Sequence, residues 1–481
     1  MNQAYFIGID IGTQGARVVL VNQDGHLLGA ADRVFEVTAR FRVEQDPQEW
    51  WDTCLKLLRQ VCKEVGAVND LLLVSAITVT STSGTVIPLD KDFQPLHGAI
   101  MYSDGRSVKE AERCRDVATA FGARGYTAFN TSCGLPKMLW YLNSYPGKKE
   151  HIRLFVHAAD YITGKLSGNF STTDYTNVLK SGYDLHQLKW PAYVTEQLYI
   201  PEEWLQQVVP SGTPIGYLQP FLAAELGLPP TVRITVGITD GCASQVAAGA
   251  VEPGNWNTTI GTTLVVKGVT YTEIEDPEGA LYCHRHPEGL WMPGGASNTG
   301  ADWVSVLFSG EEINVLSGKA ADLVPTSYFS WPLLQQGERF PFVAPQAKGF
   351  MPEDISRELL LAANMEGVAY IERYAYERIK ELSGEKIEKI CTAGGGSNND
   401  IWLKIRSNIL NLPVYKMKHV TGANGAAVVA AASTHFNSLR QAARSMVHAE
   451  KIVTPDPWLA TVYNDRYQHF INLLKNKGYI F

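Results

Sequence analysis

The chain has 481 residues, of which 45% are hydrophobic, 19% charged and 10% aromatic. This is an ordinary globular composition, and at roughly 100–200 residues per domain the length predicts two or three domains. A net charge of −7, from 42 Lys and Arg against 49 Asp and Glu, argues against a nucleic-acid or anionic-membrane partner. There is no apolar run of roughly 18 residues and no signal-peptide pattern, and the seven cysteines are an odd, scattered set, so we expect a cytoplasmic protein with free thiols.

The first half of the chain opens with a strand, a glycine-bearing loop and a hairpin. Residues 5–10 form an apolar run, 11–15 form the loop, and the run 17–22 is joined to residues 26–37 by the turn signal Asp24-Gly25. A hairpin directly after the first strand argues against a plain doubly wound fold, in which a helix should follow. Apolar spacing further along predicts helices over residues 48–65, 108–121 and 136–143, and a buried strand over 71–79.

The second half repeats the opening pattern after a break at Pro253-Gly254. Just before that break, residues 231–238 are predicted as a strand and 242–250 as a helix, so Asp240 stands at a helix N-terminus, where negative charge is favoured. The tripeptide Ile11-Gly12-Thr13 then returns as Ile260-Gly261-Thr262, again between two strands, which predicts a duplicated domain. The later elements are predicted as a strand over 387–391 and helices that begin near residues 400, 421 and 458.

The sequence lacks the common nucleotide and nucleophile signatures. We find no G-x-x-x-x-G-K-[ST], no G-x-G-x-x-G and no G-x-S-x-G. Three glycine-bearing strand ends remain, at Gly12–Gly15, Gly261–Thr262 and Gly394–Gly396, where backbone N–H groups can form anion nests. Each alone is more often a simple turn, but three of them, two inside a duplication, favour a nucleoside triphosphate as ligand.

Two carboxylates are candidates for the chemistry of phosphoryl transfer. Asp10 ends a buried strand, where a carboxylate is costly unless it binds a metal or hydrogen-bond donors. Asp240 either caps its helix or acts as a base that takes a proton from an attacking hydroxyl. The alternative metal site at Cys283-His284-Arg285-His286 is disfavoured because no second Cys/His cluster completes it.

A series of blocks in one order resembles the FGGY carbohydrate kinases, within the superfamily of sugar kinases, actin and heat-shock ATPases. The blocks are Gly8–Thr13, Glu44–Pro47, Tyr102–Arg106, Leu135–Trp140, Thr239–Gly241, Ile260–Thr262 and Gly394–Asn399. The resemblance implies an α/β fold of two duplicated actin-like ATPase (ribonuclease H-like) domains with a cleft between them. The sugar-binding domain would take residues 1–247 and the C-terminal helix 453–481, and the ATP-binding domain residues 248–452.

The same resemblance implies roles for individual residues. Asp240 would be the catalytic base, and Asp10 would hold Mg²⁺ and the transferring phosphate. The sugar would be bound by Ser83, Asp104 and Arg106. The residues implied for ATP are Thr13, Gln14, Gly15, Gly261 and Thr262 along the phosphates, Gly295 in a loop over the nucleotide, and Gly395, Gly396, Asn399 and Trp402 at the adenosine.

The substrate implied is a small ketose that is phosphorylated by ATP and Mg²⁺ on its terminal hydroxyl. The segment Ser81–Thr85 resembles ribulokinase-like sugar kinases of cyanobacteria and plants, whereas xylulokinase-like members usually have Gln-Met-His-Gly there. We therefore expect a pentulose, D-ribulose first and D-xylulose second, with other polyols left open. Departures from the family pattern at Gln14 and Phe41-Arg42 leave the sugar undecided, and the segment at 348–351 is shorter than the family's.

Two other classes of function stay open at this point. A chaperone-like ATPase of the same fold is disfavoured because a single helical tail follows the nucleotide domains. A sugar-sensing pseudokinase without turnover is disfavoured by the presence of both Asp10 and Asp240, although Gln14 keeps it open. The partners expected are the sugar and ATP, without nucleic acid or membrane, and a homodimer is left open.

Overall fold

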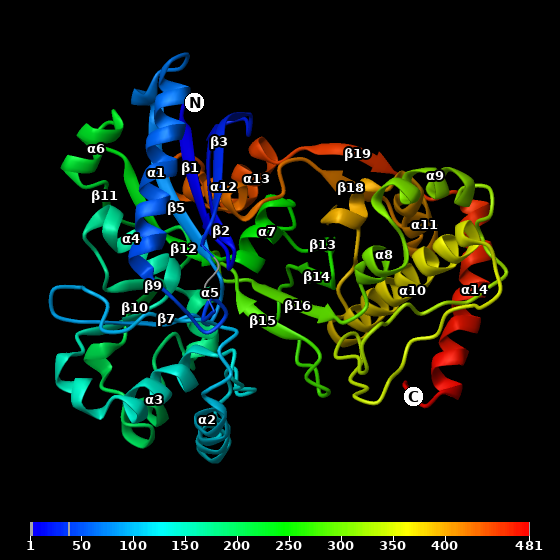
Figure 1. The fold of residues 1–481 in the computed structure, drawn as a ribbon, viewed down its shortest axis with the longest axis horizontal. Coiled ribbons are helices and arrows are strands. Elements are labelled where there is room, and N and C mark those ends of the chain that lie inside the picture. The colour runs from blue at the N-terminus through cyan, green and yellow to red at the C-terminus, as the bar shows by residue number, and fades with distance from the viewer. Residues whose placement is uncertain (1–2, 37–38, 481) are drawn as a thin grey trace. The chain divides into compact units, whose positions relative to one another are not determined.

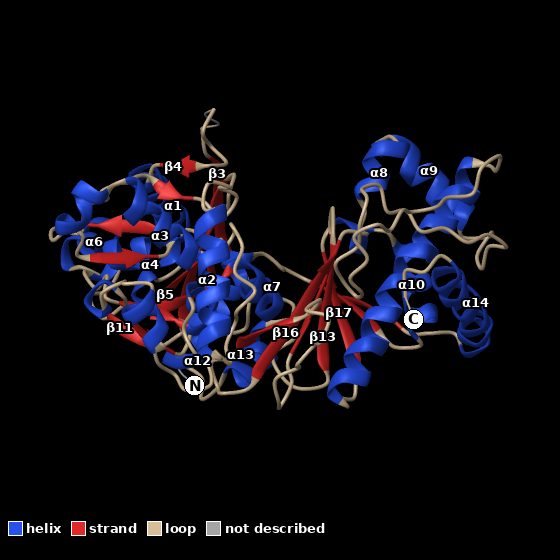
Figure 2. Ribbon diagram, turned by 90° about the horizontal axis from the view of Figure 1, so that it is seen from below, coloured by secondary structure: helices blue, strands red, loops and turns tan. Residues whose placement is uncertain are grey.

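The computed structural model describes residues 3–36 and 39–480 and divides into two compact units (Figure 1). The first unit holds the chain up to Ala247 together with His284–Gly289 and His419–Val447. The second holds Ala248–Cys283, Leu290–Lys418 and the chain from His448 onward. Each unit is a β-sheet with helices packed on its faces (Figure 2), so the α/β class is confirmed.

The first unit is built on a six-stranded sheet that begins as predicted. β1 (Tyr5–Ile11) pairs antiparallel with β2 (Gly15–Asn22) and parallel with β5 (Val74–Ser81). Part of the predicted third strand, at Val37, lies outside the described residues. The order across the sheet is β11 (Pro214–Tyr217), β12 (Arg233–Thr239), β5, β1, β2 and β3 (Leu27–Val34).

The two faces of β1 are covered by two different helices. Ile7, Ile9 and Ile11 belong to the hydrophobic cluster that packs against α1 (Pro47–Gly66). On the other face, a Cβ on Gly8 would lie 1.8 Å from the carbonyl oxygen of Ala423 in α12 (Gly422–Thr434). Only glycine lets the strand and this helix come so close, because any side chain would meet helix backbone.

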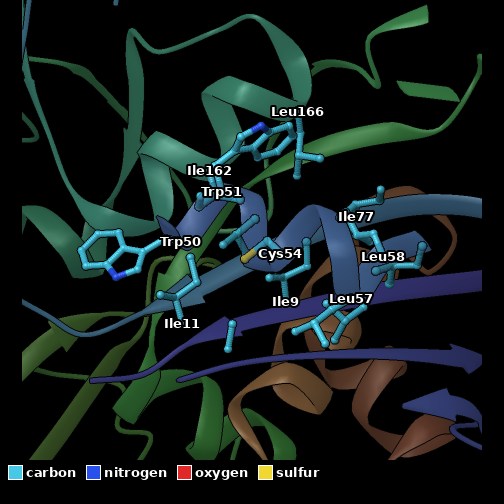
Figure 3. Close-up of a cluster of buried hydrophobic side chains, with 14 of the residues drawn as sticks. Ile9, Ile11, Trp50, Trp51, Cys54, Leu57, Leu58, Ile77, Ile162 and Leu166 are labelled. Carbon is cyan, nitrogen blue, oxygen red and sulfur yellow. The ribbon is translucent and has the colours of Figure 1, made fainter. Parts of the chain in front are cut away.

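Helix α1 supplies much of the core of the first unit (Figure 3). Asp46 caps it by accepting a hydrogen bond from the backbone N–H of Gln48 (2.9 Å), and Pro47 takes the first helical position. Its buried residues recur at helical spacing and face strands β1 and β5 and helix α4 (Ala158–Ser167). The labelled side chains of this layer are Trp50, Trp51, Cys54, Leu57, Leu58, Ile9, Ile11, Ile77, Ile162 and Leu166.

The rest of the first unit consists of short elements around this sheet. Its other helices are α2 (Val108–Phe121), α3 (Gly134–Ser144), α5 (Tyr175–Val178), α6 (Pro220–Leu226), α7 (Asp240–Ala247) and α13 (Leu439–Met446). Three strand pairs complete it: β4 (Glu44–Gln45) with β7 (Ala99–Ile100), β6 (Ile87–Leu89) with β8 (Leu154–Val156), and β9 (Thr172–Asp174) with β10 (Gln207–Val209).

The sheet of the second unit repeats the topology of the first. β13 (Asn255–Ile260) pairs antiparallel with β14 (Leu264–Gly268) and parallel with β17 (Lys389–Ala393), as β1 pairs with β2 and β5. The duplication predicted from the two Ile-Gly-Thr tripeptides is therefore present in the topology. The order across this sheet is β15 (Tyr282–Arg285), β16 (Trp291–Ser297), β14, β13, β17, β18 (Val414–Met417) and β19 (Ala449–Val453).

The helices of the second unit include the C-terminal one, which the predicted division had joined to the first domain. Helix α14 (Pro457–Asn476) lies beside α10 (Arg357–Ser383; Figure 1). Tyr467 of α14 donates a hydrogen bond to Glu377 of α10 (2.7 Å). Residues 419–447, predicted in the second domain, instead lie in the first unit, because α12 packs on β1. The remaining helices are α8 (Asp302–Leu307), α9 (Gly310–Ala320) and α11 (Asp400–Leu410).

A fully buried ion pair joins α10 to α11. Both side chains, Glu372 and Arg406, have 0% exposure, and the guanidinium donates Nε and Nη2 to the two carboxylate oxygens at 2.7 Å each. Nη1 of Arg406 donates to the hydroxyl of Thr392 in β17 (2.8 Å). This bidentate geometry satisfies charges that would otherwise be very costly to bury.

A second buried carboxylate of α10 predicts a pH-dependent stability. Glu366 accepts hydrogen bonds from Thr326 N (2.9 Å), Thr326 Oγ1 (2.7 Å) and Tyr463 (2.8 Å), yet burial raises its pKa to about 7. The folded protein then retains a proton that the unfolded chain releases at lower pH, so stability falls as the pH rises from about 4.5 to about 7.

We therefore expect Glu366→Gln to gain stability relative to the native chain by up to about 3 kcal/mol between about pH 5 and about pH 8. Glutamine does not titrate, so it avoids the cost of ionising a buried carboxyl. Melting temperatures of both proteins across this range measure the difference. A difference that does not change with pH would contradict the prediction.

The predicted elements agree with the structure, with small shifts at their ends. Strand β5 begins at Val74, because residues 71–73 form a 3₁₀ turn capped by Asp70, and α7 begins at Asp240 itself. Within residues 3–36 and 39–480, no helix is both long and apolar enough to span a bilayer.

Candidate active site

Asp10 lies near the carboxyl end of β1 on the face covered by α12. A Cβ on Gly422, the first residue of α12, would lie 2.7 Å from Asp10 Oδ2, so the carboxylate sits against the positive end of that helix. Asp10 Oδ1 is buried and has no hydrogen-bond partner among the described residues. A buried oxygen left without a donor in this position fits a cation ligand.

Asp240 is close enough to Asp10 for their charges to interact. Asp240 follows β12 directly and its Oδ1 accepts a hydrogen bond from the N–H of Gly241 (2.7 Å). Burial and, to a smaller extent, the negative charge of Asp240 raise the pKa of Asp10 to about 7, against an opposing effect of Arg17. A cation held by Asp10 would favour the ionised form of this carboxylate.

The glycine loop between β1 and β2 borders a pocket of about 680 Å³, within the size range of small-molecule sites. Asp10, Thr13, Gln14 and Gly15 all line this pocket. The buried side-chain amide of Gln45 donates a hydrogen bond to the carbonyl oxygen of Thr13 (3.0 Å) and so stabilises the loop. The predicted phosphate residues of this half are therefore brought together with Asp10.

Ser83 follows β5, the strand between β1 and β12 in the sheet. Its hydroxyl oxygen is buried and has no hydrogen-bond partner in the part of the chain that the structure describes. Asp10, Ser83 and Asp240 thus lie at the carboxyl ends of three adjacent parallel strands, the edge at which open α/β sheets bind ligands.

Asp104 and Arg106, the other predicted sugar residues, form a pair with each other. Asp104 is 2% exposed and accepts hydrogen bonds from the backbone N–H (2.9 Å), Nε and Nη2 (2.6 Å) of Arg106. The guanidinium also bonds Glu44 Oε1 (2.6 Å) and lies 4.0 Å from the ring centre of Trp140. Arg106 is thereby fixed in one orientation by two carboxylates and one aromatic face.

Lys137 is a buried cation of this region to which the motif analysis gave no role. Its side chain is 0% exposed, and its ammonium donates to the carbonyl oxygen of Thr131. Burial lowers its pKa to about 8, while the charge of Asp104 acts in the opposite direction. The sequence did contain a signal for Lys137: it stands in the block Leu135–Trp140, at helical spacing from Trp140.

In the second unit, the two other glycine loops follow neighbouring parallel strands. Gly261 and Thr262 follow β13, and Gly394–Gly396 follow β17. A Cβ on Gly394 would lie 2.4 Å from the carbonyl oxygen of Ile260, so the two loops touch. A Cβ on Gly261 or Gly395 would meet no atom within 4 Å, which leaves backbone there open to a ligand.

The remaining residues predicted to bind ATP differ in how accessible they are to a ligand. Asn399 caps α11, accepting from the N–H groups of Ile401 and Trp402 at 3.0 Å each. Trp402 is 2% exposed and donates its indole N–H to Met365, so most of its side chain is core. Gly295 is buried in β16, where a Cβ would lie 2.3 Å from the ring of Phe340. Gly295 thus makes room for packing rather than for a ligand.

Comparison with family models covers most of the chain. Residues 5–247 match the model of the FGGY family of carbohydrate kinases, N-terminal domain. Residues 257–434 match the model of the C-terminal domain of the same family.

Individual relatives match over nearly full length at low identity. The xylulose kinase of Bacillus subtilis (strain 168) is 25% identical, over 98% of this chain and 96% of its own. The gluconokinase of Bacillus licheniformis is 25% identical, over 85% and 84%. Among solved structures, the xylulose kinase of Rhodospirillum rubrum has a TM-score of 0.85 at 25% identity, covering 98% of both chains. The gluconate kinase of Lactobacillus acidophilus has a TM-score of 0.84 at 21% identity, covering 99% of this chain and 98% of its own.

Proposed function

Because the chain belongs to the FGGY family of carbohydrate kinases, we propose that it transfers the terminal phosphoryl group of ATP to the terminal hydroxyl of a small ketose, a pentulose. The observation that supports this most directly is the pair Asp10 and Asp240, two interacting carboxylates at the carboxyl ends of β1 and β12, which flank β5 in the first sheet. One carboxylate can serve a cation and phosphate while the other accepts a proton.

In the proposed reaction Asp240 is the base. It accepts the proton of the sugar hydroxyl as the hydroxyl oxygen forms its bond to the γ-phosphorus. The bond between that phosphorus and the bridging oxygen breaks, and ADP leaves with the electron pair. A positioned base contributes roughly 10²–10⁴-fold to such a step.

Asp10 is the residue that would hold Mg²⁺, and its unpartnered Oδ1 fits this role. Mg²⁺ is usually bound by one or two carboxylates together with phosphate oxygens, and when bound it neutralises charge on those oxygens. Thr13 and Gly15 would line the phosphates in the first unit, as would Gly261 and Thr262 in the second. The open backbone at Gly395 and the cap at Asn399 are proposed to receive the adenosine.

The sugar is proposed to bind at Ser83, Asp104 and Arg106. The buried, unpartnered hydroxyl of Ser83 offers a donor and an acceptor to a polyol, and the fixed Arg106 offers directed N–H groups. The Ser81–Thr85 segment favours D-ribulose as the acceptor, whereas the names of several relatives favour D-xylulose. Gluconate is a second candidate, because other relatives are named gluconokinases.

A substrate panel tests this proposal. ADP release is measured by a coupled assay with ATP and Mg²⁺ in the presence of D-ribulose, D-xylulose, D-gluconate, glycerol and a matched aldose, D-ribose. We expect strong stimulation by a pentulose and little by D-ribose, since the aldose lacks the 2-keto group. Stimulation by D-gluconate alone would replace the pentulose assignment, and no stimulation by any compound would favour a sugar sensor without turnover.

A further inference from the structure

The last peptide group within β12 joins Ile238 to Thr239, one residue before Asp240, and it is hydrogen-bonded on both sides to threonine hydroxyls. Its carbonyl, on Ile238, accepts a hydrogen bond from Thr80 Oγ1 (2.7 Å), and its N–H, on Thr239, donates to Thr176 Oγ1 (2.8 Å). Thr80 and Thr176 are both 0% exposed. Hydrogen bonds of this kind are strongly directional, so the peptide plane has one permitted orientation.

The hydroxyl of Thr176 is itself fixed from behind by Asp174. Thr176 Oγ1 donates to Asp174 Oδ1 (2.6 Å), and the backbone N–H of Thr176 donates to the same oxygen (2.7 Å). Ser211 also donates to it (2.9 Å), and Asn177 donates to Oδ2. Because the Thr176 proton is committed to Asp174, its oxygen lone pairs face the N–H of Thr239.

These hydrogen bonds add to the backbone pairing that already holds β12 in the sheet. Strand β12 is already paired with β5 on both sides of a register shift between Thr235 and Ile238, and its residues from Ile234 onward are buried. Burial of a carboxylate costs free energy, and at Asp174 four hydrogen-bond donors offset this cost. The chain of hydrogen bonds ends at the peptide group one residue before Asp240.

We propose that Thr176, oriented by Asp174 and opposed by Thr80, is a positioning residue for the catalytic base Asp240. The proposal rests on the base assignment made above for Asp240. It adds that kcat depends on the hydroxyl of residue 176, which is 0% exposed. A displacement of about 1 Å in a catalytic group can cost on the order of 100-fold in rate.

The test compares Thr176→Val, which removes the hydroxyl at nearly constant shape, with Thr176→Ser, which keeps it. We expect Thr176→Val to lower kcat by about 10–100-fold with little change in the KM of the sugar, and Thr176→Ser to restore most of kcat. Thr80→Val, which frees the other side of the same peptide, is expected to lower kcat in the same way, and it serves as the test variant if Thr176→Val does not fold.

Thr235→Val is the matched control. Thr235 lies on the same strand, is 0% exposed, and bonds the hydroxyl of Thr78 well away from Asp240 in the chain. It should lose comparable stability, measured by thermal melting, and keep its kcat. The proposal is overturned if Thr176→Val retains kcat as Thr235→Val does, or if Thr176→Ser loses as much as Thr176→Val.

Asp240→Asn distinguishes a failure of the positioning role of Thr176 from a failure of the base role of Asp240. If Asp240→Asn is inactive while the Thr176 variants keep their kcat, the positioning role fails and the base assignment stands. If Asp240→Asn remains active, the base assignment itself is wrong.

Discussion

Asp240→Asn is expected to lower kcat by about 10²–10⁴-fold while the protein stays folded and binds its sugar. The asparagine oxygen can accept the same hydrogen bond from Gly241 N–H that Asp240 Oδ1 accepts at 2.7 Å, so the start of α7 should be preserved. The amide cannot take up a proton at neutral pH, so the attacking hydroxyl would lose its base. Single-turnover phosphorylation and calorimetric sugar binding measure the two effects separately.

The matched control for this substitution is Asp456→Asn. Asp456 also begins a helix, accepting from Trp458 N–H (2.9 Å) and Leu459 N–H (3.1 Å) at the start of α14. Asp456→Asn should lower the free energy of unfolding by no more than the loss of a typical helix cap does, roughly 1 kcal/mol, and it should not change kcat. Should Asp240→Asn keep a rate close to that of Asp456→Asn with the preferred sugar, Asp240 is not the base.

Arg406→Met is expected to destabilise the second unit by about 3–5 kcal/mol. The substitution removes one partner of the fully buried pair and leaves Glu372 without its two 2.7 Å donors, in surroundings from which water is excluded. It also removes the 2.8 Å bond to Thr392 in the central strand β17. Hydrogen exchange of peptides from β17 and α11 reports the loss within that unit.

Two further variants show whether the buried charge is the cause. Glu372→Leu combined with Arg406→Met removes both charges and should recover most of the lost stability. Arg378→Met, also on α10, removes partly exposed pairs with Glu278 (3.3 Å) and Glu381 (3.6 Å) and a longer one with Asp276 (3.8 Å), and it should cost about 1 kcal/mol or less. A double variant as unstable as the single one would show that packing of the arginine stem, not an uncompensated carboxylate, dominates.

The elements and the duplicated topology were predictable because they depend on local patterns. Continuous apolar runs predicted β1 and β12, and helical spacing with the Asp46-Pro47 start predicted α1. The two Ile-Gly-Thr tripeptides predicted that β13 and β14 repeat β1 and β2. In each case the residues that decide the structure are neighbours in the chain.

The features that were missed depend on contacts between distant segments. The contact of Gly422 with Asp10 joins residues that lie more than 400 positions apart, and small residues at a helix start do not reveal what they face. Similarly, Thr176 and Asp174 are distant from Asp240 in the chain, and only the fold shows that they reach the peptide group between Ile238 and Thr239. The helix at the C-terminus was joined to the first domain because its polar partners, Glu366 and Glu377, lie on α10, which no local pattern connects to it.

Because Gly8 packs against Ala423, the first sheet can be covered on this face only after residue 423 has been synthesised. When the ribosome has released residues up to Ala247, one apolar face of the first sheet still lacks α12, which is synthesised near the end of the chain. Exposed sheet faces of this kind promote aggregation, so we expect the nascent chain to be prone to aggregation until that helix emerges. Cutting the gene after codon 247 would consequently yield an insoluble fragment rather than an autonomous sugar-binding module.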